Sequence, residues 1–129
     1  MTTPTPVRTV IRRAALAAAG GAVGTAARLG ISLLTLDAPG AVLAANLVGA
    51  LMLGILTARI PPSDARVFLG TGMLGGFTTY SAFALDSVEL WATSPALAGG
   101  YIAASIMGGL LAAWLGLRIG GALGRRSAS

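Results

Sequence analysis

Four long apolar stretches, separated by short connectors, constrain the fold of this 129-residue chain more than any other feature. They run from about Val10 to Leu36, Ala41 to Ala58, Val67 to Trp91 and Ala96 to Gly121. The hydrocarbon core of a bilayer is about 30 Å thick, and a helix that rises 1.5 Å per residue needs roughly 20 residues to cross it. The sequence therefore predicts an all-α membrane protein with four transmembrane helices.

The composition agrees with this fold class and excludes several kinds of chemistry. Hydrophobic residues make up 55% of the chain and charged residues 10%, whereas a soluble domain has about 25% charged residues. The sequence contains no Cys and no His, which excludes sites that depend on thiolates, imidazoles or zinc bound by them. We also find no pairing of a nucleophile with a base. We therefore expect the protein not to be an enzyme.

Turn residues and prolines mark the three connectors. Leu36–Gly40 reads LDAPG, Arg59–Arg66 reads RIPPSDAR, and Ala92–Ala96 reads ATSPA. Proline cannot continue a helix, and Asp, Pro and Gly favour turns. The predicted organisation is a polar N-terminal tail over residues 1–9, a four-helix transmembrane domain over residues 10–122, and a basic C-terminal tail over residues 123–129.

The nine basic residues, all arginines, indicate how the chain is oriented. With four spans, both tails and the middle connector share one side, and the connectors of the opposite side hold no Arg or Lys. The arginines of the shared side are Arg8, Arg12, Arg13, Arg59, Arg66, Arg118, Arg125 and Arg126. The positive-inside rule then places both termini in the cytoplasm. Clustering at helix ends is typical of membrane topology, so we expect no nucleic-acid partner.

Small residues recur at helical spacing in the first and last stretches. Gly20 and Gly24 form one pair, and Gly116, Gly120 and Gly124 continue the pattern. Small residues four apart allow helices to pack closely in lipid. A glycine-rich composition explains the spacing equally well, so both interpretations stay open. Four short spans form a thin bundle, which favours an oligomer.

Polar side chains inside a bilayer each need a partner or a role, and Asn46 and Arg28 are two that lie within predicted spans. Asn46 in the second span is either an amide that bonds two helices, worth about 1 kcal/mol, or an N–H donor to a passing anion. Spacing alone favours the first. Arg28 in the first span either extends to the membrane surface or draws anions into a vestibule.

The stretch GTGMLGGFTTYSAF, Gly70–Phe83, is unusual for a lipid-facing helix. Gly75 and Gly76 each weaken a helix by about 1 kcal/mol relative to Ala, and Thr78 and Thr79 can bond backbone carbonyls. A break here would free carbonyl oxygens inside the membrane, where they must meet protein, water or a cation. A bound cation and a simple kink both remain possible.

Four motifs in order resemble the Fluc (CrcB) family of fluoride channels. The strongest is GGFTTYSAF, and the others are GAVGTAARLGIS, LAANLVGALMLG and YIAASIMGG. The resemblance covers nearly everything from Gly20 to Gly121. It implies a fluoride-selective channel in the cell membrane that exports cytoplasmic fluoride passively, and an antiparallel dimer with two separate anion pores.

The resemblance also implies roles for particular residues. Backbone carbonyls of Gly75 and Thr78 would hold a structural Na⁺ at the dimer centre, where the third helix breaks between Gly75 and Thr79. The residues implied for the fluoride pathway are Asn46, Thr79, Tyr80, Phe83, Tyr101 and Ser105, the last two as a polar track. Arg28 would lie near a vestibule, and Asp86 would match a family Glu at the pore end.

The chain departs from the family pattern at four positions. Tyr80 stands where the family has Phe, Val42 and Ala82 stand where it has Thr, and Gly109 stands where a second track Ser often occurs. The polar track is therefore thinned.

Two other functions and two forms of dimer are weighed against this interpretation. A small multidrug-type transporter needs a membrane-embedded carboxylate, and the first span has none before Asp37. A non-conducting assembly subunit is the other alternative. Because eight arginines fall on one side, the antiparallel partner is either the chain itself or a related chain of opposite topology. Fluoride and membrane lipid are the other expected partners.

Overall fold

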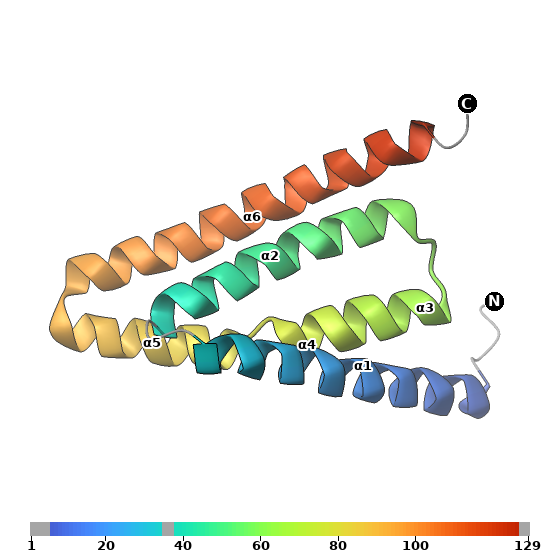
Figure 1. The fold of residues 1–129 in the computed structure, drawn as a ribbon, viewed down its shortest axis with the longest axis horizontal. Helices are drawn as coiled ribbons and strands as arrows, with labels where there is room; N and C mark the ends of the chain where they lie inside the picture. The colour runs from blue at the N-terminus through green and yellow to red at the C-terminus, as the bar shows by residue number, and fades with distance from the viewer. Residues whose placement is uncertain (1–5, 35–37, 127–129) are drawn as a thin grey trace.

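The computed structural model describes residues 6–34 and 38–126, which form helices joined by short turns (Figure 1). The elements are α1 (Val7–Leu34), α2 (Ala38–Arg59), α3 (Asp64–Arg66), the π-helix η1 (Val67–Leu74), α4 (Gly75–Phe77), α5 (Tyr80–Thr93) and α6 (Pro95–Arg126). No strand occurs within the described ranges. The all-α prediction is confirmed.

Three of the helices are long and apolar enough to cross a membrane: Val7–Leu34, Pro39–Arg59 and Pro95–Gly124. Helix therefore extends into both predicted tails, since α1 begins at Val7 and α6 ends at Arg126. Part of the predicted Leu36–Gly40 connector, including Asp37, lies outside the described residues, as do residues 1–5 and 127–129 of the tails.

The third predicted span is a broken helix, as expected. Elements α3, η1 and α4 follow one another without interruption to Phe77, and α5 begins at Tyr80. The break consists of Thr78 and Thr79, whose ψ angles of 157° and 122° are extended. Gly75 keeps helical angles, with φ of −64° and ψ of −36°. The two threonines, and not the two glycines, thus end the helix.

The first half of the broken span contains a π-helix that the sequence did not predict. Gly70, Gly72 and Leu74 of η1 are buried. A Cβ on Gly72 would lie 2.8 Å from the Ala17 carbonyl oxygen and 2.9 Å from the Gly20 Cα. A wider π turn often occurs at a functional position, and here it lies next to the crossing of α1.

Glycines account for the close packing of the helix pairs. Helix α1 packs along η1 and α4, and α2 packs along α6. A Cβ on Gly20 or Gly24 would collide with a backbone carbonyl oxygen of η1, and one on Gly116 would collide with the carbonyl oxygen of Leu51 in α2. A Cβ on Gly120 would lie 2.7 Å from the Ala58 Cβ. These four glycines thus serve helix packing.

Gly124 differs, because a Cβ there would meet nothing within 4 Å. Within the chain, the predicted pattern of small residues therefore has a packing role up to Gly120, and Gly124 packs against no other helix of the described residues. Composition alone is enough to explain Gly124.

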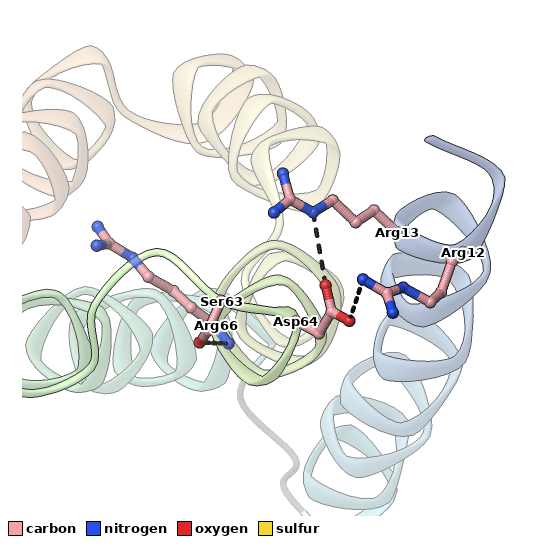
Figure 2. Close-up of polar contacts among 5 residues, drawn as sticks. All are labelled: Arg12, Arg13, Ser63, Asp64 and Arg66. Carbon is pink, nitrogen blue, oxygen red and sulfur yellow. Dashed lines mark hydrogen bonds and ion pairs between the residues drawn. The ribbon is translucent and has the colours of Figure 1, made fainter. Parts of the chain in front are cut away.

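The start of α1 and the end of α6 lie at the same end of the molecule as the connector between α2 and α3 (Figure 1). At this end the Asp64 carboxylate pairs with the guanidinium groups of Arg12, at 2.8 Å, and Arg13, at 3.5 Å (Figure 2). The Ser63 hydroxyl caps α3 by accepting from the Arg66 N–H. Exposed ion pairs contribute about 0–1 kcal/mol each, so these pairs help to hold α1 on α3 without determining the fold.

Candidate functional site

The break in the third span is held by the side chain of Asn46. The Asn46 Oδ1 atom accepts from the Thr79 N–H at 2.8 Å, and Asn46 Nδ2 donates to the Thr79 carbonyl oxygen at 3.0 Å. One amide thus satisfies both polar backbone groups of Thr79, which a continuous helix would have satisfied internally. Asn46 thus connects α2 to the broken span, which is the role that its spacing in the sequence favours. Its NH₂ group has a second hydrogen, so the donor role also stays open.

Helix α1 contacts the other side of the break. The Thr25 hydroxyl donates to the Gly76 carbonyl oxygen at 3.3 Å, and Arg28 Nε lies 3.5 Å from the same oxygen. Arg28 is therefore placed beside the break, a position that neither sequence interpretation anticipated. It does not line the groove described next.

A groove of about 680 Å³ runs along the break. Its lining comes from α2, the break, α5 and α6, and consists of Asn46, Thr78, Thr79, Tyr80, Phe83, Ala84, Ser87, Ile102, Ser105 and Ile106. Five of the six residues predicted for the pathway are brought together here, and the exception is Tyr101. None of the described lining residues is charged, so the polar groups of the groove are amides and hydroxyls.

Aromatic rings form a row beside the groove. The ring centroids of Tyr80 and Phe83 are 5.9 Å apart, and those of Phe83 and Tyr101 are 5.6 Å apart. Tyr80 is 81% exposed. The edge of an aromatic ring carries the positive part of its quadrupole. Rings that present their edges to the groove would attract an anion although the rings themselves carry no formal charge.

The predicted polar track of Tyr101 and Ser105 is divided in the structure. The Tyr101 hydroxyl donates to Asp86 Oδ2 at 3.2 Å, and both side chains are buried, with Tyr101 9% and Asp86 7% exposed. Ser105 lies in the groove, and its buried Oγ has no hydrogen-bond partner among the described residues. Asp86 accepts from Tyr101 and does not line the groove, and its place at the pore end stays a prediction.

Ser87 is a groove residue that sequence reasoning missed. Its hydroxyl donates to the Phe83 carbonyl oxygen at 2.6 Å, and the side chain lines the groove. The available signal was its position, because Ser87 is four residues after Phe83 and seven after Tyr80 and so shares their helix face.

Three carbonyl oxygens at the break have no donor among the described residues. The oxygens of Gly76 and Thr79 each accept a side-chain hydrogen bond, but no described donor reaches those of Gly75, Phe77 and Thr78. The described residues contain no cluster of His, Cys, Asp and Glu that would hold a metal ion. Ion channels use carbonyl oxygens to replace the hydration shell of an alkali cation. The free oxygens of Gly75 and Thr78, the pair implied by the family resemblance, fit a cation of that kind.

Comparison with known proteins identifies the family. The model of the family described as CrcB-like protein, Camphor Resistance (CrcB), matches residues 15–117. The fluoride-specific ion channel FluC of Paracoccus denitrificans is 43% identical over 111 residues, which are 80% of this chain and 90% of the relative. FluC 1 of Rhodococcus jostii is 44% identical, over 82% of this chain and 83% of the relative.

A third relative, the fluoride-specific ion channel FluC 2 of Bacillus subtilis, is 42% identical over 107 residues, covering 78% of this chain and 82% of the relative. The family match and these identities confirm the resemblance found in the four motifs. The chain belongs to the CrcB-like protein family.

Proposed function

We propose that this protein is a fluoride-selective channel of the cell membrane that lets cytoplasmic fluoride leave passively and so reduces its toxicity. The observation that carries the proposal is the groove, which gathers the Asn46 amide, the unpartnered Ser105 hydroxyl and the Phe83 ring without any charged lining residue. The relatives named above are fluoride-specific ion channels, which supports the same function and agrees with the expectation that the chain is not an enzyme.

The chemistry of the groove suits a small, strongly hydrated anion. Fluoride gives up water only where other donors replace it, and the amide and hydroxyls of the groove are such donors. Conduction also requires binding that is weak enough to release the ion. Donors without a fixed positive charge meet both requirements, and a larger, more weakly hydrated chloride gains less from them.

The groove argues against the transporter alternative. A small multidrug-type transporter needs a carboxylate to exchange protons for cationic drugs, and no described groove residue carries one. The one buried carboxylate among the described residues, on Asp86, accepts from Tyr101. Passive flow, with no proton coupled to it, is what this lining supports. A non-conducting subunit is distinguished by measuring flux.

A structural Na⁺ is part of the proposal. The free carbonyl oxygens of Gly75 and Thr78 would hold it, and the partner subunit, whether a second copy or a related chain, would supply the remaining ligands. When bound, the ion supplies the positive charge that compensates carbonyl oxygens freed inside the membrane. The chain's own contribution is to hold the backbone of the break in place through Asn46, Thr25 and Arg28.

An antiparallel dimer completes the proposed channel. The interior of one chain is small, because among the described residues only Ala45, Leu74, Ala98 and Tyr101 are buried hydrophobic residues. Large apolar side chains such as Leu110 and Leu111 are exposed, and we expect membrane lipid and the partner chain to cover such side chains. The partner is either the chain itself or a related chain of opposite topology.

Membrane topology decides between these partners. The arginine-rich end carries the start of α1 and the end of α6 (Figure 1), so the positive-inside rule favours a cytoplasmic position for it. A reporter fused to the C-terminus is expected to be cytoplasmic in nearly all molecules when the chain is expressed alone. That result indicates a second chain as the antiparallel partner, and an even mixture of orientations would indicate a homodimer.

Anion efflux from liposomes tests the proposed function. The topology result decides whether the chain is reconstituted alone or together with a related chain of opposite topology. At low density in liposomes, the resulting dimer is expected to release fluoride, while chloride stays inside. Equal release of the two anions would refute fluoride selectivity, and no release of either would favour the non-conducting alternative.

A further inference from the structure

We infer that Asn46 is a positioning residue for the proposed cation site, because its amide orients the Thr78 carbonyl oxygen that would bind the ion. Asn46 also lines the groove. The anion path and the cation site would then share one side chain. The inference rests on the proposed Na⁺ site and adds to it a residue that does not touch the ion.

The argument begins with the peptide group between Thr78 and Thr79. This group contains the Thr78 carbonyl and the Thr79 N–H, and the described chain has no cis peptide bond. In a planar trans peptide the C=O and N–H bonds point in opposite directions. Because the Thr79 N–H donates to Asn46 Oδ1 at 2.8 Å, the Thr78 carbonyl oxygen must point away from Asn46.

The second bond of the amide prevents this peptide from rotating. Asn46 Nδ2 donates to the Thr79 carbonyl oxygen at 3.0 Å, which fixes the next peptide along the chain. The planes on both sides of the Thr79 Cα atom are thereby held by one rigid amide. Thr79 also caps α5 by accepting from the Ala82 N–H, so the end of the break is fixed from two directions.

The other end of the break is held independently of Asn46. The Thr25 hydroxyl and Arg28 Nε both contact the Gly76 carbonyl oxygen, which lies one residue beyond the free carbonyl of Gly75. The Thr78 oxygen therefore lies between the two anchoring points, Gly76 held by α1 and Thr79 held by α2, and the Gly75 oxygen lies just before the first of them. Loss of Asn46 should release the Thr78 oxygen and leave the Gly75 side in place.

Thermal unfolding of the purified dimer in detergent, titrated with NaCl at constant ionic strength against N-methylglucamine chloride, tests the inference. A ligand that binds only the folded state raises the unfolding temperature by an amount set by the ratio of its concentration to its dissociation constant. Fitting this rise for the wild-type protein gives the Na⁺ concentration at which the site is half occupied, called the Na⁺ midpoint below. Asn46→Ala is expected to shift that midpoint to about tenfold higher Na⁺, the effect of losing about one hydrogen bond to a preorganised ligand.

Two further variants separate this role from a general effect on folding. Ser105→Ala is the matched control, because it removes a groove hydroxyl that has no described partner and leaves the break untouched. This variant is expected to keep the wild-type Na⁺ midpoint even if it lowers the rate of fluoride efflux. Asn46→Ser, whose hydroxyl can replace only one of the two bonds, is expected to lie between wild type and Asn46→Ala.

The inference is overturned if Asn46→Ala keeps the wild-type Na⁺ midpoint, or if Ser105→Ala shifts it equally. If Asn46→Ala does not fold at any Na⁺ concentration, the midpoint of Asn46→Ser decides by the same criterion. A wild-type protein insensitive to Na⁺ would refute the cation site and this inference together. Fluoride conduction is judged separately by efflux.

Discussion

Fluoride efflux is expected to fall at least about 100-fold when Asn46 is replaced by alanine. The change removes a groove donor and leaves the N–H and carbonyl groups of Thr79 without their partners. A hydrogen bond to a charged group is worth about 1.5–3 kcal/mol, and raising the barrier to fluoride passage by about 2.7 kcal/mol lowers the rate about 100-fold. The measurement is the initial rate of fluoride release from liposomes containing equal amounts of folded protein.

The matched control is Val48→Ala, on the same helix. Val48 is 50% exposed and does not line the groove, so its truncation is expected to leave the rate within about twofold of wild type. Gel filtration shows whether each variant is still a dimer. If folded Asn46→Ala releases fluoride at the wild-type rate, Asn46 has no role in the pathway.

The second large effect is expected at the crossing of α2 and α6. Gly54 and Gly116 face each other there, and a Cβ on Gly116 would lie 3.0 Å from the Ile55 nitrogen and 3.1 Å from the Gly54 Cα. Because these neighbours are backbone atoms, the helices must separate to admit even a methyl group. Gly116→Ala is expected to lower the free energy of unfolding by about 1–3 kcal/mol, and Gly116→Leu is expected to prevent folding.

Gly121→Ala on the same helix is the control, because a Cβ at that position would meet nothing within 4 Å. Alanine is the better helix former by about 1 kcal/mol, so this variant should be neutral or slightly stabilised. Thermal unfolding in detergent gives both values. Equal stability of the Gly116 and Gly121 variants would show that the crossing tolerates a side chain.

The fold could be predicted because its determinants are local. Span length and connector prolines identify the four apolar segments, and the weak helix formers between Gly75 and Thr79 locate the break. The residues at which the helix ends could not be predicted, because they depend on a tertiary contact. Asn46 offers the polar groups of Thr79 alternative partners, whereas Gly75 keeps its place in the helix.

The candidate site was predictable where it follows a helix face and unpredictable where it depends on packing. Tyr80 and Phe83 share one face of α5, and the same periodicity would have found Ser87. Spacing could not show that Tyr101 bonds Asp86, because the two residues belong to different helices. The contact of Arg28 with the Gly76 carbonyl oxygen likewise requires knowing that α1 crosses the break.

Paired measurements of fluoride and chloride efflux from the same proteoliposomes test the central claim most directly. The dimer is reconstituted at about one copy per vesicle, and release of each anion is followed with an ion-selective electrode after a K⁺ ionophore removes the opposing voltage. The uncharged groove of amide and hydroxyl donors predicts rapid release of fluoride, with chloride released no faster than from protein-free vesicles. Chloride release as fast as that of fluoride would contradict the account.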